Sequence, residues 1–214
     1  MKDKYSIIGP LYDFLAMVYS ANQIDHCKTA MHDRIRPDNS VLFAGVGHGI
    51  DALAAAERGA KVTVVDLSDT MLKKFNRKMK DREFRHPIRQ VHQDILKFSE
   101  LNQYDMVFAN FFLNVFPEEK MVEILSHLVE LAKRRGFVIV GDFSLPEGGP
   151  VRRVFQVIYW RIADLVFWMT AGNALHPVYD YAFHMKQLGL KIKTVRYFRF
   201  LFDNRYYSIL GQKK

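Results

Sequence analysis

The chain has 214 residues, of which 49% are hydrophobic and 25% are charged, and its formal net charge is +8. These values are ordinary for a globular protein, so they exclude disordered and fibrous classes, and the length suits one domain. The single cysteine, Cys27, excludes an internal disulfide, and the first ten residues hold no apolar run of the kind found in secretory signals; together these features predict a cytoplasmic protein.

The positive charge would suit an anionic partner such as a nucleic acid, an acidic membrane or a phosphorylated substrate. However, many of the lysines and arginines follow one predicted helix, residues 73 to 82, or are scattered toward the C-terminus. Charges placed in this way are typical of a solvated surface. We therefore interpret most of the excess charge as surface charge.

Five short apolar runs alternate with helical patterns in the first two thirds of the chain. They are rich in valine, phenylalanine and isoleucine, the composition of strands that are covered on both faces. The runs comprise residues 41 to 44, 61 to 66, 88 to 92, 104 to 110 and 137 to 143. This alternation predicts an α/β fold with a Rossmann-like, mostly parallel sheet and helices on both faces.

Two later helices have clear boundary signals. One is predicted to begin at Pro117 and to end with the basic residues 133 to 135 before Gly136, since basic side chains favour the negative end of a helix dipole. The other is predicted over residues 177 to 188, where Gly189 ends it.

The last 25 residues differ from the preceding pattern. Two apolar runs, residues 191 to 201 and 204 to 212, lie on either side of the turn-forming pair Asp203 and Asn204. They predict a terminal antiparallel hairpin, which brings the sheet to seven strands.

Three glycines, Gly45, Gly47 and Gly49, directly follow the first predicted strand. In an open parallel sheet, this loop is the usual ligand cradle. A side chain at Gly45 or Gly47 would keep a ligand away from the backbone, and Gly49 would let the following helix pack close to the sheet. Ile50 stands where the dinucleotide pattern GxGxxG requires its third glycine, which weakens the interpretation as an NAD-binding protein.

Asp66 is the last residue of the second predicted strand. A carboxylate at this place can accept hydrogen bonds from both hydroxyls of a ribose, so the motif favours an adenosine-containing ligand. The alternative is that Asp66 only caps the next helix.

Several segments resemble a known family. These are VLFAGVGHG, AERGAKVTVVDLSDTML, VHQDIL and YDMVFANFFLNVFP, which lie within residues 41 to 116. They resemble class I S-adenosylmethionine-dependent methyltransferases, in particular the ubiquinone/menaquinone methyltransferase-like branch. The resemblance implies S-adenosyl-L-methionine as cofactor and S-adenosyl-L-homocysteine as product.

The resemblance also implies which residues hold the cofactor. The glycine loop would line the methionine part, Asp66 would bind the ribose, Asp94 would meet the adenine amino group, and Asn110 would close the pocket. An N-terminal segment would fold over the cofactor, although its tyrosines would serve equally well in the core of an amphipathic helix. The implied cofactor-binding residues are Tyr12, Tyr19, Gly45, Val46, Gly47, Gly49, Asp66, Leu67, Met71, Asp94, Ile95 and Asn110.

One position departs from the family pattern. The family commonly has an acidic residue where this chain has Phe43, and that acid usually contacts the amino group of the methionine part. Asp51 or a backbone carbonyl could take its place.

Methyl transfer from a sulfonium mainly needs alignment of the reacting atoms, so a general base is optional. The candidates for a base are His176, His184 and Asp142, with His26 a further one, and a structural role is the alternative for each. No spacing of histidine, cysteine or acidic residues suggests a metal site.

The prediction of the acceptor depends on residues 151 to 173, an apolar segment that is partly basic. This segment would be buried structure, a dimer contact, or the roof of an apolar substrate cavity. As a roof, it could also touch a membrane through residues 151 to 170. We therefore predict transfer to a small hydrophobic acceptor, such as a quinone-like or phenolic ring or a lipid amine. The alternatives are an RNA methyltransferase, which is disfavoured because no RNA-binding module is apparent, and a non-catalytic partner-binding protein.

These predictions divide one methyltransferase domain, residues 1 to 214, into four parts. They are an N-terminal helical lid (1 to 36), a cofactor-binding core (37 to 145), a helical insertion that roofs the substrate (146 to 189) and the terminal hairpin (190 to 214). The oligomeric state stays open. The inner face of a membrane is the alternative location.

Overall fold

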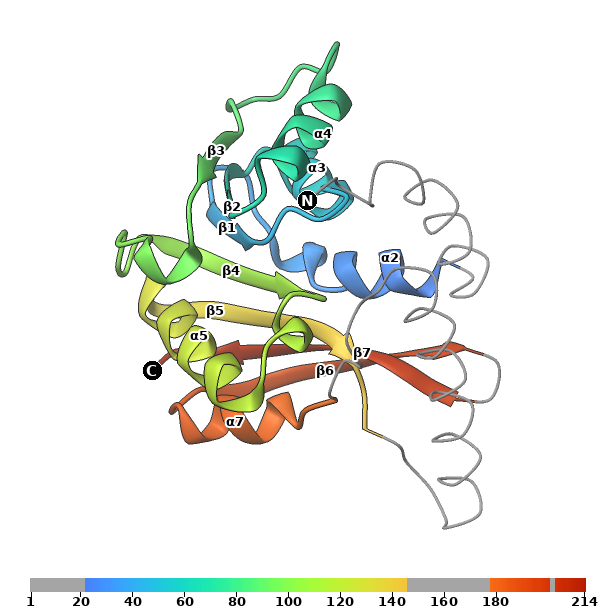
Figure 1. Cartoon of the computed structure of the whole chain (residues 1–214), viewed down its shortest axis with the longest axis vertical. Helices are drawn as coiled ribbons and strands as arrows, with labels where there is room; N and C mark the ends of the chain where they lie inside the picture. The colour runs from blue at the N-terminus through green and yellow to red at the C-terminus, as the bar shows by residue number, and fades with distance from the viewer. Residues whose placement is uncertain (1–21, 146–177, 201–202) are drawn as a thin grey trace, which may run out of the picture.

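The computed structural model describes residues 22 to 145, 178 to 200 and 203 to 214 (Figure 1). Tyr12, Tyr19, His176 and residues 151 to 170, all named above, lie outside the described residues. In chain order the elements are α2 (Gln23–Thr29), η1 (His32–Arg34), β1 (Ser40–Ala44), α3 (Ile50–Glu57), β2 (Lys61–Asp66), α4 (Asp69–Met79), β3 (Arg89–His92), η2 (Ile95–Lys97), β4 (Tyr104–Asn110), η3 (Leu113–Val115), α5 (Glu118–Leu131), β5 (Ala132–Phe143), α7 (Tyr181–Gln187), β6 (Lys191–Phe200) and β7 (Asp203–Gln212).

The sheet has seven strands in the order β3-β2-β1-β4-β5-β7-β6. The first five are parallel, and β7 runs antiparallel to both of its neighbours, β5 and β6. This topology confirms the predicted mostly parallel sheet with a terminal hairpin. The strand order reverses direction between β1 and β4, where loops lead away to opposite sides and leave a crevice.

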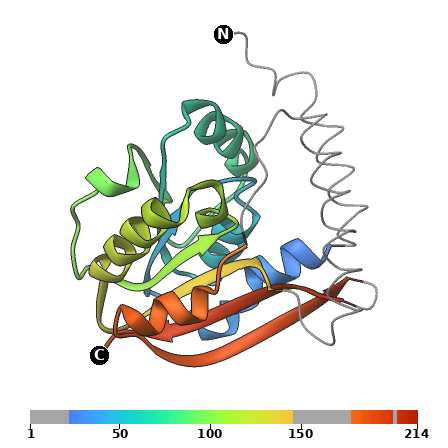
Figure 2. The same cartoon turned by 60° about the horizontal axis from the view of Figure 1, so that its bottom comes forward.

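Side chains of the central strands alternate between two apolar layers. Leu42 and Val107 pack with α5 and α7 on one face, whereas Phe43 and Phe108 pack with α3 and α4 on the other. Figures 1 and 2 show α5 and α7 in front of the sheet and α2 behind it. The central strands are therefore covered on both faces, as their apolar composition predicts.

The end of α5 corrects one prediction. The helix begins at Glu118, one residue after the predicted Pro117, and ends at Leu131, and the basic residues 133 to 135 belong to β5 instead of the last helical turn. Ala132 already pairs with Tyr104 of β4, so sheet pairing takes over from the helix at this point. The ammonium of Lys133 is 2.7 Å from a carboxylate oxygen of Asp105, and this ion pair stabilises the strand conformation.

The helix predicted over residues 177 to 188 is shorter than expected, because α7 begins at Tyr181, where the Asp180 side chain accepts a hydrogen bond from the Phe183 amide. Its predicted end is confirmed, since Gly189 has a left-handed φ of 81°. A change to any residue with a side chain would strain this position.

The N-terminal helices are fastened to the terminal hairpin. Arg196 of β6 donates hydrogen bonds to the carboxylate of Asp33, at 2.7 and 3.3 Å, and to the carbonyl of Ala30. Cys27 of α2 is fully buried and its thiol donates to the carbonyl of Tyr207 in β7 at 3.2 Å. Burial raises the pKa of this thiol, so Cys27 is an inert structural thiol, as expected.

Candidate cofactor site

The glycine loop lies at the carboxyl ends of the parallel strands, beside the reversal between β1 and β4. It joins β1 to α3, and all three of its glycines have positive φ. A Cβ at Gly47 would meet no atom within 4 Å, whereas one at Gly45 would lie 2.7 Å from the Phe112 ring and one at Gly49 would lie 2.1 Å from the Phe75 ring. Gly47 thus leaves the backbone open to a ligand, while Gly45 and Gly49 accommodate aromatic neighbours.

This geometry refines two expectations. We expected Gly45 to admit a ligand to the backbone, but the group that approaches it in the described residues is Phe112. We expected Gly49 to let the following helix approach the sheet, but the ring against it belongs to α4, the helix after the next strand.

Asp66, at the end of β2, lies directly against the glycine loop. One of its carboxylate oxygens accepts a hydrogen bond from the Val46 amide and the other accepts one from the Ser68 amide, both at 2.7 Å. An ionised carboxylate has about four acceptor positions, so two remain for the hydroxyls of a ligand. The carboxylate and the open backbone at Gly47 therefore belong to one site.

The residues predicted to hold adenine follow β2 and β3. Leu67 is 70% exposed, so its side chain is accessible to the face of a planar ligand. Asp94 caps η2 by accepting a hydrogen bond from the Leu96 amide at 3.0 Å. The Ile95 side chain is buried in the core, so a contact from Ile95 would have to come from its backbone. Met71 lies in the first turn of α4, partly buried, and its amide donates to the Ser68 hydroxyl.

Asn110 and Asp51 form a pair on the other side of the loop. The Asn110 side-chain amide, at the end of β4, donates to the Asp51 carboxylate at 2.8 Å and to the Lys28 carbonyl at 3.1 Å. Asp51 lies in the first turn of α3 and is 7% exposed. The predicted residue Asn110 is thus joined to Asp51, which sequence reasoning had named only as a possible substitute for an acid at position 43.

Phe43 contributes no polar group to the site. Its ring stacks on Phe108 at 4.9 Å between ring centroids, inside the apolar layer. His32 packs edge-on against both rings, and neither of its ring nitrogens has a hydrogen-bond partner among the described residues. Burial lowers the pKa of His32 to about 4, so the ring is neutral near pH 7. Sequence reasoning missed His32, because nothing local marks it as buried.

The residues predicted as catalytic bases do not gather in the described structure. Asp142, in β5, has no exposed surface, and its carboxylate accepts hydrogen bonds from the Asn114 amide, the Phe143 amide and the Tyr181 hydroxyl. Burial raises its pKa to about 7. His184, in α7, forms a pair with Glu118 at 3.3 Å. His26 is exposed on α2.

An aromatic cluster adjoins the end of β4. Phe111, Phe143 and Tyr206 have ring centroids 5.4 to 5.8 Å apart. The Lys28 ammonium lies 5.8 Å from the Phe111 centroid, and the Arg205 guanidinium lies 5.7 Å from that of Phe143. Phe111 has a left-handed φ of 51°, a conformation that is uncommon outside glycine and that concentrates at functional sites.

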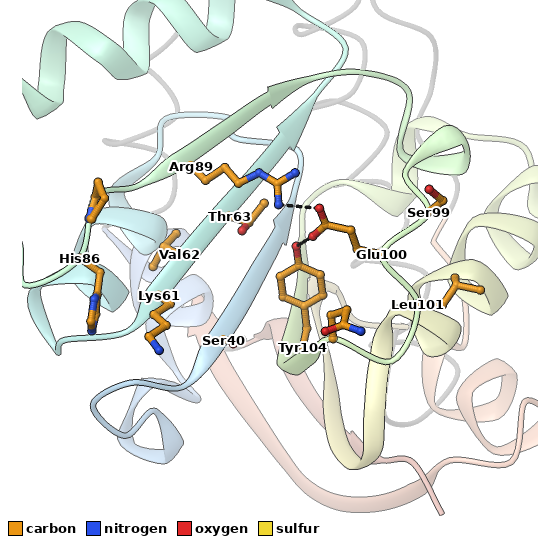
Figure 3. A pocket seen from close by; sticks show the side chains of 12 residues that line it. Ser40, Lys61, Val62, Thr63, His86, Arg89, Ser99, Glu100, Leu101 and Tyr104 are labelled. Atoms are coloured by element: carbon orange, nitrogen blue, oxygen red, sulfur yellow. Dashed lines mark hydrogen bonds and ion pairs between the residues drawn. The ribbon is translucent and has the colours of Figure 1, made fainter.

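The opposite edge of the sheet holds an open hollow of about 720 Å³, shown in Figure 3. It lies at the amino ends of β1, β2 and β4, away from the glycine loop. Two of its charged side chains are already paired, since Glu100 accepts a hydrogen bond from the Tyr104 hydroxyl and forms an ion pair with Arg89, both at 2.6 Å. The size of this hollow therefore does not make it the cofactor site.

Comparison with known proteins indicates the kind of domain that the chain holds. Residues 41 to 136 match the model of a methyltransferase domain. The magnesium protoporphyrin IX methyltransferase of Synechocystis PCC 6803, solved with bound S-adenosylhomocysteine, superposes with a TM-score of 0.70 at 20% identity, covering 92% of this chain and 84% of that one. Over residues 41 to 136 the chain is therefore similar to S-adenosylmethionine-dependent methyltransferases. The matched residues begin at Val41 and include the glycine loop, Asp66 and Asn110.

Curated relatives of this methyltransferase domain are more distant in sequence. The demethylmenaquinone methyltransferase of Renibacterium salmoninarum is 27% identical over 80% of this chain and 70% of its own length. The dual O-methyltransferase/FAD-dependent monooxygenase elcB of Phaeosphaeria nodorum is 29% identical over 74% of this chain, which spans only 17% of that protein.

The residues present fit the cofactor of this domain, because an open backbone and an accepting carboxylate stand side by side. In the described part of the chain, no group of three histidine, cysteine or acidic side chains is arranged to hold a metal ion. None of the helices described there has both the length and the hydropathy of a membrane span.

Proposed function

We propose that this chain transfers the methyl group of S-adenosylmethionine to a small hydrophobic acceptor with a planar ring, quinone-like or phenolic. The observation that carries the proposal is the cluster of Phe111, Phe143 and Tyr206 next to Asn110. Aromatic side chains favour offset or edge-to-face contact with another ring. The similarity to a demethylmenaquinone methyltransferase supports a place in the ubiquinone/menaquinone methyltransferase-like branch.

The cations at the cluster favour an acceptor that carries oxygen. The Lys28 ammonium lies over Phe111, and the Arg205 guanidinium lies over Phe143. Positive charge stabilises a developing phenolate or enolate and repels a protonated amine. A ring oxygen, or a ring carbon activated by such an oxygen, is thus a better acceptor here than the lipid amine that the sequence left open.

S-adenosylmethionine supplies a methyl group that its sulfonium already activates. As the bond from the acceptor to the methyl carbon forms, the sulfur–carbon bond breaks, sulfur keeps the electron pair, and the acceptor proton leaves. The protein holds the acceptor ring in line through its aromatic cluster and fixes the ribose through Asp66. Such alignment contributes about 7 to 11 kcal/mol to lowering the barrier.

A general base is needed only where the acceptor proton does not leave by itself. His176, His184 and Asp142 stay the proposed candidates. Asp142 would need its three hydrogen bonds to open before it could reach an acceptor, since it has no exposed surface. Contact of residues 151 to 170 with a membrane and a cytoplasmic location likewise remain predictions.

The test is transfer of isotope label from S-adenosylmethionine to a naphthoquinol, a catechol, a phospholipid amine and total RNA, offered separately. Label in a ring acceptor supports the proposal. Label in RNA or in the lipid amine, with none in the rings, would overturn it, and absence of S-adenosylhomocysteine binding at millimolar concentration would favour a non-catalytic protein.

A variant tests whether the acceptor contacts the aromatic cluster. Phe143→Leu should lower kcat/KM for the acceptor by about two- to tenfold, because the proposed ring contact with the acceptor is worth about 0.5–1.5 kcal/mol, while the affinity for S-adenosylhomocysteine stays the same. Phe183→Leu is the matched control, since this ring is exposed on α7 outside the cluster. Equal effects of the two variants would remove the cluster from the acceptor site.

A further inference from the structure

The side chain of Lys28, in α2, is partly buried, and its ammonium lies 5.8 Å from the centroid of the Phe111 ring. Lysine ammonium groups usually reach bulk water or pair with an acid. Within the described part of the chain, no carboxylate oxygen lies within 4 Å of this ammonium. A cation without an acidic partner there therefore adjoins the aromatic cluster of Phe111, Phe143 and Tyr206.

The backbone holds both sides of this contact in place. The Lys28 carbonyl accepts a hydrogen bond from the side-chain amide of Asn110 at 3.1 Å. Phe111, the next residue after Asn110, donates its own amide to the Gly141 carbonyl at 2.7 Å. The start of the lysine side chain and the ring beside its ammonium are thus both fixed to the end of β4, and a charge held in this way needs little reorganisation during a reaction.

The sheet separates this cluster from the described candidate bases. Successive side chains of a strand point to opposite faces. Ile139 of β5 packs in the layer with α3, so Phe143 shares that face, whereas Asp142 points to the other face and meets Tyr181 of α7. His184 also belongs to α7. Figures 1 and 2 show α7 and α2 on opposite sides of the sheet, so an acceptor on the α2 side is out of reach of both bases.

Several other charged or titratable groups come from α2 and from the elements packed against it. They are Asp25 and His26 on α2, Asp51 on α3, Asp142 on β5, Arg196 on β6, and Arg205 and Tyr206 on β7. Arg196 is held by Asp33, and Arg205 is only 3% exposed. His26 stands two positions before Lys28, which places it about 200° away around the helix axis. Among these described groups, Lys28 combines a positive charge with access to the cluster.

We propose that Lys28 is a catalytic residue, whose ammonium contacts the ring hydroxyl of the acceptor and makes this hydroxyl ionise without a protein base. An opposite charge within about 4–6 Å lowers the pKa of an acidic group by about 1–3 units. The hydroxyl proton passes to water, the oxygen bonds to the methyl carbon as the carbon–sulfur bond breaks, and sulfur keeps that electron pair. Lys28 keeps its own proton throughout. This inference rests on the proposed function, because it assumes both the cofactor and a ring acceptor.

The test is the pH dependence of kcat for a series of substituted phenols, since this profile reports groups that ionise in the bound complex. In the unmodified protein, the midpoint should follow the pKa of each phenol and lie about 1–3 units below it. Lys28→Gln should raise the midpoint by about one unit or more. At pH 7, well below the ordinary phenol pKa of about 10, it should lower kcat about tenfold or more.

Two control variants separate charge from structure. Lys28→Arg keeps the charge and should keep the midpoint within about half a unit of that of the unmodified protein. Lys186→Gln removes an exposed lysine from α7 and should leave the profile unchanged. Calorimetry should show the same affinity for S-adenosylhomocysteine in all of these proteins. A single midpoint for every phenol would indicate a protein base such as His176 and would overturn the role of Lys28, as would an unchanged midpoint in Lys28→Gln.

A measurement on the unmodified protein keeps the inference testable should Lys28→Gln fold poorly. The absorbance of a nitrophenol reports its ionisation. When bound together with S-adenosylhomocysteine, this phenol should ionise about 1–3 units below its pKa in water, and no such displacement would contradict the role of Lys28. A protein that binds S-adenosylhomocysteine but methylates no member of the phenol series or any other ring would overturn the proposed function itself.

Discussion

The two edges of the sheet treat their acidic side chains differently. At the amino edge, Glu100 pairs with Arg89, and Asp38 pairs with Arg85 and His86 (Figure 3 shows the first of these pairs). At the carboxyl edge, the described residues that donate hydrogen bonds to Asp51 and Asp66 are all neutral amides. The amino edge holds a hollow of about 720 Å³, and Glu100 and Arg89 in its lining are paired with each other. In our proposal the ligand site lies instead where carboxylates have no cation among the described residues.

The largest expected effect is the loss of ligand affinity on substitution of Asp66, which tests this contrast directly. Asp66→Ala removes two charge-assisted hydrogen bonds to the ribose, each worth about 1.5–3 kcal/mol, so the affinity for S-adenosylhomocysteine should fall more than about a hundredfold. Calorimetry measures the affinity, and circular dichroism checks the fold. The amino-edge control, Arg89→Gln, should bind the ligand normally; a folded Asp66→Ala with unchanged affinity would remove Asp66 from the site.

Asp142 extends the comparison, because it too has no cation beside it among the described residues but is wholly enclosed. Its pKa is about 7 in the folded protein and ordinary when unfolded, so the folded state holds its proton more tightly. The free energy of unfolding should therefore decrease as the pH rises from about 4 to 7, by about 1.4 kcal/mol per unit of pKa difference.

The variant Asp142→Asn cannot lose this proton, and its amide can donate to the Tyr181 hydroxyl. Urea unfolding at pH 5 and pH 8 should show a smaller fall in stability for the variant than for the unmodified protein. The same fall in both proteins would mean that Asp142 is ionised in the folded state throughout this range.

His32 gives a smaller effect of opposite sign. Its folded pKa of about 4 lies below the ordinary histidine value, so the unfolded state binds the proton more readily. Stability from this residue is complete above about pH 6.5 and is lost as the pH falls toward 4. His32→Phe, which keeps a ring between Phe43 and Phe108, should raise the melting temperature at pH 5 relative to the unmodified protein and change it little at pH 7. An equal change at both pH values would contradict the buried neutral ring.

Local sequence patterns were sufficient for the fold and for part of the site. Apolar runs covered on both faces predicted β1 to β5, and the ends of neighbouring parallel strands meet at one edge, so the contact of Asp66 with the glycine loop was foreseeable. The basic residues 133 to 135 led to a wrong prediction for the end of α5, where they were placed in the last helical turn. The pairing of Ala132 with Tyr104 depends on a strand 28 residues earlier, and local helix signals do not report it.

The neighbours of the acidic side chains at the site could not be predicted from sequence, for a different reason. Asn110 and the Lys28 carbonyl are 82 positions apart, and Asp51 and Asn110 are 59 apart. Whether an acid has a cation beside it depends on such distant contacts, as does the burial of His32. Sequence could name Asp51 as a candidate, but only the folded chain shows that its described donors are the Ala52 and Asn110 amides.

The fastening of η1 to β6 by Arg196 has a consequence for how the binding site matures. Lys28 belongs to α2, directly before the clamp that Arg196 makes with Ala30 and Asp33, and its carbonyl helps to orient Asn110. A nascent chain that still lacks its final two strands already holds the glycine loop and Asp66, but α2 lacks the contacts that it makes with β6 and β7. We therefore expect α2, and with it the carbonyl that orients Asn110, to take its final place only when synthesis of the hairpin is complete.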